Sequence, residues 1–280
     1  HSYSSAASDV YKRQGLYSSS STKLVLSDVI FEANTALDIE GSSVFGRGGA
    51  IAFSMATNFN LENVVIRQNE AVYGGGVYSP MNASVTLQNI VLDSNIANKS
   101  GGGLYLNASS SLQAYDSVLR NNSALFDDGG GAYLLTFNVS SIYSYPSSAL
   151  FSNLTFVGNM AKNGNGGGMY RSGGIFMNVF NSSFVSNSGS EGGGLYLVDG
   201  SSKFANVSMV SNYGVTYGGG LRVSDNESLV MASSSLEWNS AGESGGGAYL
   251  GNEVEVQASD TLYSENIAYG SSGGGGAVYV

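Results

Sequence analysis

Carboxylates are the side chains of this sequence whose types and spacing come nearest to a catalytic or metal site. The tightest acidic group is Asp127-Asp128, and Glu191 and Glu243 fall in equivalent turns of other repeats. Such acids serve as Ca²⁺ ligands or as the acid and base of polysaccharide-cleaving enzymes. Strand spacing places them two or more repeats apart, on the order of 10 Å, which is too far for a carboxylate pair. We therefore predict that the chain is not an enzyme, with Asp127 and Asp128 as candidates for a weak Ca²⁺ contact.

The sequence has few of the residues that act as nucleophiles or bind transition metals. The sequence has no cysteine, and its one histidine is His1. We interpret residues 1–14 as a non-native segment, because residues 5–14 resemble a translated sequencing adapter. Without His1, Ser-His-Asp catalysis and histidine-metal sites are excluded. We expect no cofactor.

Composition indicates a repetitive, folded chain. It contains 40 glycines and 2 prolines in 280 residues, carries a formal charge of −10, and has 42% hydrophobic residues. That apolar content is enough for a continuous core. The negative charge and the lack of a basic stripe argue against nucleic acid as a partner. We find no apolar stretch of the ~18 residues needed for a membrane span.

An asparagine recurs nine times with the same neighbours. An apolar residue precedes it by three positions and an alanine or glycine follows it by two. We expect these asparagines to form a buried structural ladder in which each amide bonds to the next. The nine are Asn34, Asn69, Asn95, Asn122, Asn159, Asn187, Asn212, Asn239 and Asn266.

Glycine clusters and short alternating segments lie between the asparagines. Gly48-Gly49-Ala50 is the first cluster, and later ones end at residues such as Gly103 and Gly131. A repeat of about 27 residues cannot close a core alone, so repeats must stack. We predict an all-β, single-stranded parallel β-helix of about nine coils over residues 15–280, right-handed because parallel crossovers are. We interpret it as a fragment of a longer repeat protein.

These paired motifs carry a family resemblance. Phe31-Glu32-Ala33-Asn34 together with Gly48-Gly49-Ala50-Ile51, and their successors, resemble the FxxN and GGAI repeats of the chlamydial polymorphic outer membrane proteins. The resemblance covers residues 23–280, although Gly-Gly-Gly mostly replaces Gly-Gly-Ala. It implies a pectin-lyase-like β-helix exposed at the cell surface, often adhesive.

A tyrosine stands two positions after most glycine clusters. Parity predicts that these side chains point outward and form an aromatic stripe, broken at Ala52 and Arg222. Two interpretations stay open: the rings stabilise a parallel sheet, or they form a platform for glycans or a second rod. The members are Tyr78, Tyr105, Tyr133, Tyr170, Tyr196, Tyr249 and Tyr279.

Nine Asn-x-Ser/Thr sequons suggest N-linked glycans. No ladder asparagine begins a sequon, because alanine or glycine occupies the required position. Small-residue packing explains that column equally well. The candidate acceptors are Asn82, Asn98, Asn107, Asn138, Asn153, Asn181, Asn206, Asn226 and Asn121, the last crowded by Asn122.

The favoured function is a structural or adhesive segment, extracellular or at the cell surface, within a larger protein or filament. The expected partners are N-linked glycans, further copies associating end to end or laterally, and a carbohydrate or cell-surface ligand. The alternatives are a carbohydrate-active β-helix enzyme and a non-catalytic glycan-binding module. Enlarged turns at 37–47 and 136–153 are interpreted as variable loops.

Overall fold

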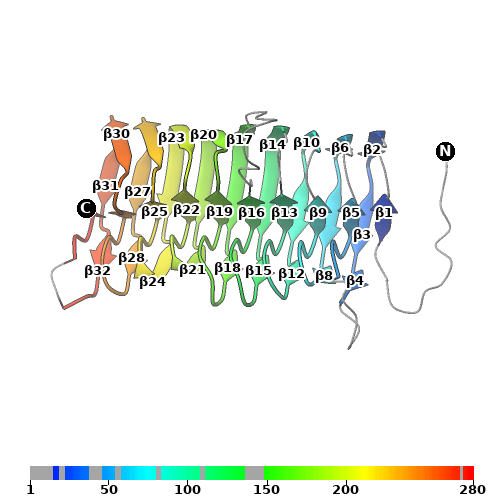
Figure 1. Cartoon of the computed structure of the whole chain (residues 1–280), viewed down its shortest axis with the longest axis horizontal. Coiled ribbons are helices and arrows are strands. Elements are labelled where there is room, and N and C mark those ends of the chain that lie inside the picture. The colour runs from blue at the N-terminus through cyan, green and yellow to red at the C-terminus, as the bar shows by residue number, and fades with distance from the viewer. Residues whose placement is uncertain are drawn as a thin grey trace.

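The computed structural model describes residues 15–280 except 19–22, 38–45, 54–57, 80–82, 108–110, 136–147 and 272–273. The described residues form strands, turns and bends and contain no helix. Three parallel sheets run side by side along one long axis and together form a rod (Figure 1). The molecule is therefore a parallel β-solenoid, as the repeat pattern predicted.

Sheet 1 has ten strands, most of which directly follow a glycine cluster. Neighbouring strands pair in parallel, so each strand lies beside its equivalent in the next coil. The strands are β1 (Leu16–Ser18), β5 (Ile51–Phe53), β9 (Val77–Ser79), β13 (Leu104–Asn107), β16 (Ala132–Leu135), β19 (Met169–Ser172), β22 (Leu195–Val198), β25 (Leu221–Ser224), β29 (Ala248–Leu250) and β33 (Val278–Tyr279).

Sheet 2 has fourteen strands and is the widest. In the central coils one ten-residue strand crosses it, whereas the outer coils carry two shorter strands. The strands are β2 (Lys23–Ser27), β3 (Ile30–Glu32), β6 (Asn58–Glu62), β7 (Val65–Arg67), β10 (Val85–Gln88), β11 (Val91–Asp93), β14 (Ser111–Arg120), β17 (Ser148–Val157), β20 (Phe176–Val185), β23 (Ser201–Val210), β26 (Ser228–Ala232), β27 (Ser235–Glu237), β30 (Glu255–Ser259) and β31 (Leu262–Ser264).

Sheet 3 has nine strands, each following a ladder asparagine directly. We number the coils as rungs 1 to 9 by these strands, and eight turns of chain separate the first from the last. The expected nine repeats correspond to these nine rungs. The strands are β4 (Thr35–Ala36), β8 (Glu70–Ala71), β12 (Ile96–Ala97), β15 (Ser123–Ala124), β18 (Met160–Ala161), β21 (Ser188–Glu191), β24 (Tyr213–Tyr217), β28 (Ser240–Ala241) and β32 (Ile267–Ala268).

The core is a set of apolar columns that run the length of the rod. The residue three positions before each ladder asparagine points inward: Ile66, Leu92 and Phe184 are at most 1% exposed. Stacking within a column is direct, since the rings of Phe156 and Phe184 lie 4.7 Å apart and nearly parallel. Each rung thus covers the apolar face of its neighbour, which one repeat could not do alone.

The glycine clusters make the corner between sheets 3 and 1. Gly101 has φ +72°, which a residue with a Cβ rarely adopts. A Cβ on Gly102 would lie 2.3 Å from the carbonyl oxygen of Gly130, and one on Gly103 would lie 2.6 Å from that of Gly131. Glycine is therefore required both by the turn and by the close approach of adjacent coils.

Candidate functional surfaces

The nine ladder asparagines form one continuous hydrogen-bonded column. Nδ2 of Asn122 donates to Oδ1 of Asn159 at 3.0 Å and to the carbonyl oxygen of Leu92 at 2.9 Å. The backbone N–H of Asn122 donates to the same Oδ1 at 3.1 Å. Equivalent amide bonds run from Asn34 to Asn266. The seven central members are 0% exposed, so the ladder is structural, as predicted.

A second polar column, which the sequence reasoning missed, lies on the outside of sheet 2. Its residues stand six positions before each ladder asparagine, are exposed, and have φ between 47° and 59°, a conformation that Asn and Asp tolerate best after glycine. We call it the outer corner column. It comprises Asp28, Asn63, Asn89, Asp116, Asn153, Asn181, Asn206, Ser233 and Asp260.

Side-chain amides connect neighbours of the outer corner column. Nδ2 of Asn89 donates to Asn63 at 2.7 Å, and Nδ2 of Asn206 donates to Asn181 at 2.9 Å. Nδ2 of Asn153 donates to the Asp116 carboxylate at 2.7 Å. That bond, with a second from Gln88, lowers the pKa of Asp116. The fixed offset of six residues was the signal in the sequence that would have revealed this column.

The sequon asparagines with described side chains lie mainly on exposed corners. Asn153, Asn181 and Asn206 belong to the outer corner column. Asn121 and Asn226 are exposed at other corners with positive φ, whereas Asn98 is half-buried. Two further acceptors, Asn82 and Asn138, and the side chain of Asn107 lie outside the described residues.

The tyrosines of sheet 1 form a stacked column on its outer face. Tyr105 and Tyr133 are register partners with ring centroids 4.9 Å apart, and Tyr133 and Tyr170 lie 5.3 Å apart with an interplanar angle of 5°. Similar stacking extends the column to Tyr78, next to Ala52, and to Tyr196. The predicted stripe exists, but its central rings are half-buried because each covers the face of the next.

Arg222 lies in this column between Tyr196 and Tyr249, where the sequence predicted a break in the stripe. Its guanidinium carbon lies 4.2 Å from the ring centroid of Tyr249 and 5.9 Å from that of Tyr196. Nε of Arg222 also donates to the Glu191 carboxylate at 2.9 Å. A cation between aromatic faces is attracted to both rings, so Arg222 continues the stack.

Burial changes the acidity of the stacked tyrosines. It raises the pKa of Tyr170 to about 12, with a smaller contribution from the Asp128 carboxylate. The pKa values of Tyr105 and Tyr133 are also raised, first by burial and then by neighbouring tyrosines. These phenols therefore keep their protons at pH values at which an exposed tyrosine ionises.

The candidate acids do not converge. Asp128 accepts a hydrogen bond from the backbone N–H of Asn165 at 2.7 Å, and burial raises its pKa. Glu191 follows Asn165 in the same column, two rungs from Asp128, and pairs with Arg222. Asp127 is exposed. In the part of the chain that the structure describes, no three His, Cys, Asp or Glu side chains are grouped to hold a metal ion.

The core contains an ion pair that the sequence reasoning did not anticipate. Nη2 of Arg171 donates to Oγ of Ser202 at 2.7 Å and contacts Oε1 of Glu227, while Nη1 donates to the carbonyl oxygen of Val198 at 3.0 Å. Ser202 also donates to Glu227 at 2.9 Å. Both charged side chains are 0% exposed, and Arg171 Nε and Glu227 Oε2 have no hydrogen-bond partner in the part of the chain that the structure describes. The cluster connects three successive coils.

Register explains why this pair is internal. Arg171 lies between Leu134 and Leu197 in an inward column of sheet 1. Gly200 leaves room for it, since a Cβ there would lie 2.2 Å from Nη1. The signal was an arginine two positions after the inward Met169, where most other coils carry leucine or valine.

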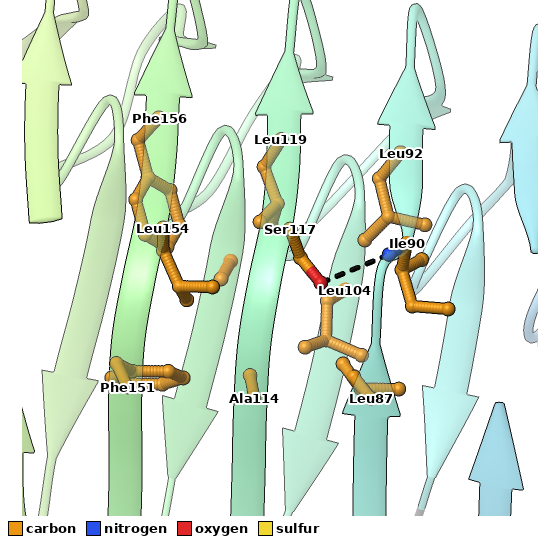
Figure 2. A pocket seen from close by; sticks show the side chains of 11 residues that line it. Leu87, Ile90, Leu92, Leu104, Ala114, Ser117, Leu119, Phe151, Leu154 and Phe156 are labelled. Atoms are coloured by element: carbon orange, nitrogen blue, oxygen red, sulfur yellow. Dashed lines mark hydrogen bonds between the residues drawn. The ribbon is translucent and has the colours of Figure 1, made fainter. Parts of the chain in front are cut away.

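A small apolar cavity lies inside the central rungs (Figure 2). Ala114 and Ala132 line it at positions that hold larger side chains in neighbouring coils, such as Phe151. Beside it, Oγ of Ser117 accepts the backbone N–H of Ile90 at 2.9 Å. Among the described residues no charged side chain lines the cavity, so it offers packing space rather than chemistry.

The sequence also predicted enlarged turns and no membrane span. Of the enlarged turns, residues 38–45 and 136–147 lie outside the described residues. Within the described ranges, the chain has no helix of the length and apolarity that crossing a bilayer requires.

Comparison with known proteins adds one relative. The metabotropic glutamate receptor-like protein R of Dictyostelium discoideum is 26% identical over 172 residues, which are 60% of this chain and 10% of that protein. No protein-family model matches the sequence, and no solved structure matches it. The fold and its columns thus define a parallel β-solenoid, and the chain spans about a tenth of the length of this relative.

Proposed function

We propose that this chain is a structural or adhesive rod on the outside of the cell, N-glycosylated and part of a larger surface protein. The columns described above hold neighbouring rungs together, since the asparagine ladder, the glycine corner and the tyrosine column each connect one rung to the next. A rigid rod with regularly spaced surface positions suits the display of groups along a cell surface. We propose no enzymatic activity for it.

One observation carries the proposal. The asparagines fall into two populations, in which buried ladder members never begin a sequon while five sequon asparagines are exposed at corners. In Asn153 one N–H of the amide bonds to Asp116, and the second hydrogen of Nδ2 is the one that a glycan would replace. Glycan attachment is thus compatible with the outer corner column.

The repeat type and the relative support a surface location. The motifs around Asn34 and Gly48 resemble chlamydial polymorphic outer membrane proteins, and we propose that the chain shares their repeat. The Dictyostelium relative carries a receptor-like name. We infer an extracellular or cell-surface setting, with a carbohydrate or cell-surface ligand as partner.

Secretion from eukaryotic cells tests the proposal. The intact mass of the secreted chain should fall on treatment with an N-glycosidase, and Asn181→Gln should remove one glycan where that site is occupied. Asn252→Gln, exposed but outside any sequon, is the matched control and should leave the mass pattern unchanged. Recovery of a wholly unmodified chain from the secretory pathway would overturn the glycosylated-surface proposal.

The tyrosine column gives little support to the alternative of a glycan-binding module. A sugar ring stacks on a free aromatic face, but Tyr133 has Tyr105 on one face and Tyr170 on the other. Only ring edges then reach solvent in the middle of the column. The geometry favours the interpretation in which the tyrosines stabilise sheet 1.

A further inference from the structure

The outward column of sheet 3 alternates in size with a period of two rungs. From rung 3 onward a large apolar side chain is followed by a serine at every step. The four apolar members, Ile96, Met160, Tyr213 and Ile267, are 37–48% exposed. The column reads Thr35, Glu70, Ile96, Ser123, Met160, Ser188, Tyr213, Ser240 and Ile267 for rungs 1 to 9.

Residues beside this column extend the exposed apolar face. Val215 and Tyr269, two positions after Tyr213 and Ile267, are 51% and 66% exposed, with Gly242 between them in rung 8. Trp238, at 60% exposure, stands two positions before Ser240. Grouped apolar side chains at this exposure mark an interaction surface more often than isolated ones do.

We propose that sheet 3 packs face to face against sheet 3 of a second copy, with the two rods antiparallel. A two-fold axis between rungs 5 and 6 makes rung n of one copy face rung 11 − n of the other. Every large side chain of the column then meets a small or polar one. Ile96 of each copy faces Ser240 of the other copy. In the same register Met160 faces Ser188, Tyr213 faces Ser123, and Ile267 faces Glu70.

The flanking columns fit the same register without adjustment. The axis places each flanking column opposite the same column of the second copy. Trp238 in rung 8 of one copy therefore faces Ser94 in rung 3 of the other. Val215 of rung 7 faces Leu125 of rung 4, an apolar pair. Antiparallel registers in which n and its partner sum to an even number would place large side chains on large ones. Self-complementarity of this kind is what a two-fold interface requires.

The contact is large enough for a specific but weak dimer. Rungs 2 to 9 are eight rungs, each about 4.8 Å thick, so the overlap is roughly 38 Å long. Three outward columns about 7 Å apart give a width of roughly 15 Å, hence about 1,100 Å² buried in total. Specific interfaces need about 1,000 Å² or more. Because the contact is closed by its own symmetry, it predicts dimers rather than open fibres.

This inference specifies the lateral association expected from the sequence for the proposed surface rod. Its test does not involve secretion or glycans, so the dimer and the proposed function can fail independently. Two sequon residues connect them. Asn98 lies two positions after Ile96 and faces Gly242 of the second copy in this register, and Asn121 lies two positions before Ser123 and faces Ser211. A glycan on either asparagine would stand in the contact, so that modification and this dimer exclude each other. The test therefore uses unglycosylated protein.

Sedimentation equilibrium of the full chain is the first measurement. Wild type should show a concentration-dependent monomer–dimer equilibrium. Met160→Asp places a charge beside the axis in both copies and should weaken dimerisation at least about tenfold. Val230→Asp is the matched control, because Val230 is 38% exposed on sheet 2 against 37% for Met160, and it should dimerise as wild type does. Circular dichroism checks that each variant is folded.

Cross-linking fixes the register independently of those substitutions. The chain has no cysteine, so Ile96→Cys and Ser240→Cys each give one thiol. A short bismaleimide should couple a mixture of the two single variants, whose thiols face each other, and should leave either variant alone uncoupled. In a dimer of one variant, the two identical thiols lie five rungs, about 24 Å, apart, which is too far for a short reagent. A monomeric wild type, or coupling in either variant alone, would overturn the proposed dimer.

Discussion

Asn122 donates a hydrogen bond from Nδ2 to Oδ1 of Asn159, 3.0 Å away and 37 residues further along the chain. Other ladder steps span 25 to 28 residues, except the first, which spans 35. The ladder therefore continues through the two longest coils, and the additional residues change neither its partners nor its distances. Insertions in this fold are accommodated at the corners while the amide column keeps its register.

Asn122→Leu should lower the free energy of unfolding by about 1–3 kcal/mol, because it leaves buried backbone groups without partners. The carbonyl oxygen of Leu92 and the N–H of Asn95 lose their bonds to this side chain. Chemical denaturation measures the change. Asn252→Leu, in an exposed turn, is the control and should lie within about 0.5 kcal/mol of wild type. An unchanged midpoint for Asn122→Leu would contradict the structural role of the ladder.

Glu227→Ala should destabilise the rod by about 3–5 kcal/mol, since it leaves the buried Arg171 charge uncompensated. The double variant Arg171→Leu/Glu227→Leu should recover most of that loss, because apolar replacements remove both charges together. The denaturant midpoints of the two variants test this prediction, and the double variant should have the higher midpoint.

A solvent-exposed ion pair is the control for this prediction. Arg67 and Glu32 are 3.0 Å apart with both side chains 45% exposed, so Arg67→Ala should cost no more than about 1 kcal/mol. Equal losses for Arg67→Ala and Glu227→Ala would show that the Arg171 pair is not isolated from solvent.

Most of the architecture could be predicted because its signal repeats. Asn122 and Gly103 occur in columns of nine or so equivalent residues, and a column of one residue type requires a stacked cross-section. The buried pair of Arg171 and Glu227 could not be found in this way, because neither residue belongs to a column of like residues. The two side chains meet only through the register of three coils. The bridging position of Arg222 likewise depended on side-chain geometry.

The surface was predicted less completely than the core. The outer corner column was readable from its offset to the ladder, yet Asn153 and Asn181 were considered only as sequons. The tyrosines were correctly placed on the outer face, but ring stacking decides which part of Tyr133 reaches solvent. Parity gives the direction of a side chain and not the area that its neighbours cover.

The stability of the fold should fall above pH 10 because of the tyrosine column. Unfolded tyrosines ionise near a pKa of about 10, whereas Tyr170 in the fold ionises near 12. Between these values the unfolded state binds fewer protons, so the free energy of unfolding decreases as pH rises, and the contribution is fully present below pH 10. Denaturation at pH 8 to 12 measures the slope, and Tyr133→Phe should make it shallower. A slope that Tyr133→Phe leaves unchanged would contradict this assignment.

Ala114→Val should stabilise the rod by about 0.5–1 kcal/mol by filling the interior cavity of Figure 2. The matched control is Ala149→Val, at a buried alanine that does not line the cavity, which should cost about 1–3 kcal/mol through overpacking. Thermal unfolding of both variants gives the comparison. The cavity assignment fails if the two substitutions change stability in the same direction.

The central claim is that equivalent residues of successive coils lie on one line along the rod. Val25, Gln113 and Gln257 are exposed members of one outward column of sheet 2, in the first, fourth and ninth coils. Spin labels on cysteines at two of these positions measure the spacing directly by pulsed electron resonance, with labelled chains diluted in unlabelled protein. The pair Gln113→Cys/Gln257→Cys spans five spacings, about 24 Å, and Val25→Cys/Gln257→Cys spans eight, about 38 Å, before allowance for the label linkers. Distances that grow by about 4.8 Å per coil are the predicted result. Equal distances for the two pairs, or a shorter distance for the second, would contradict the stacked arrangement.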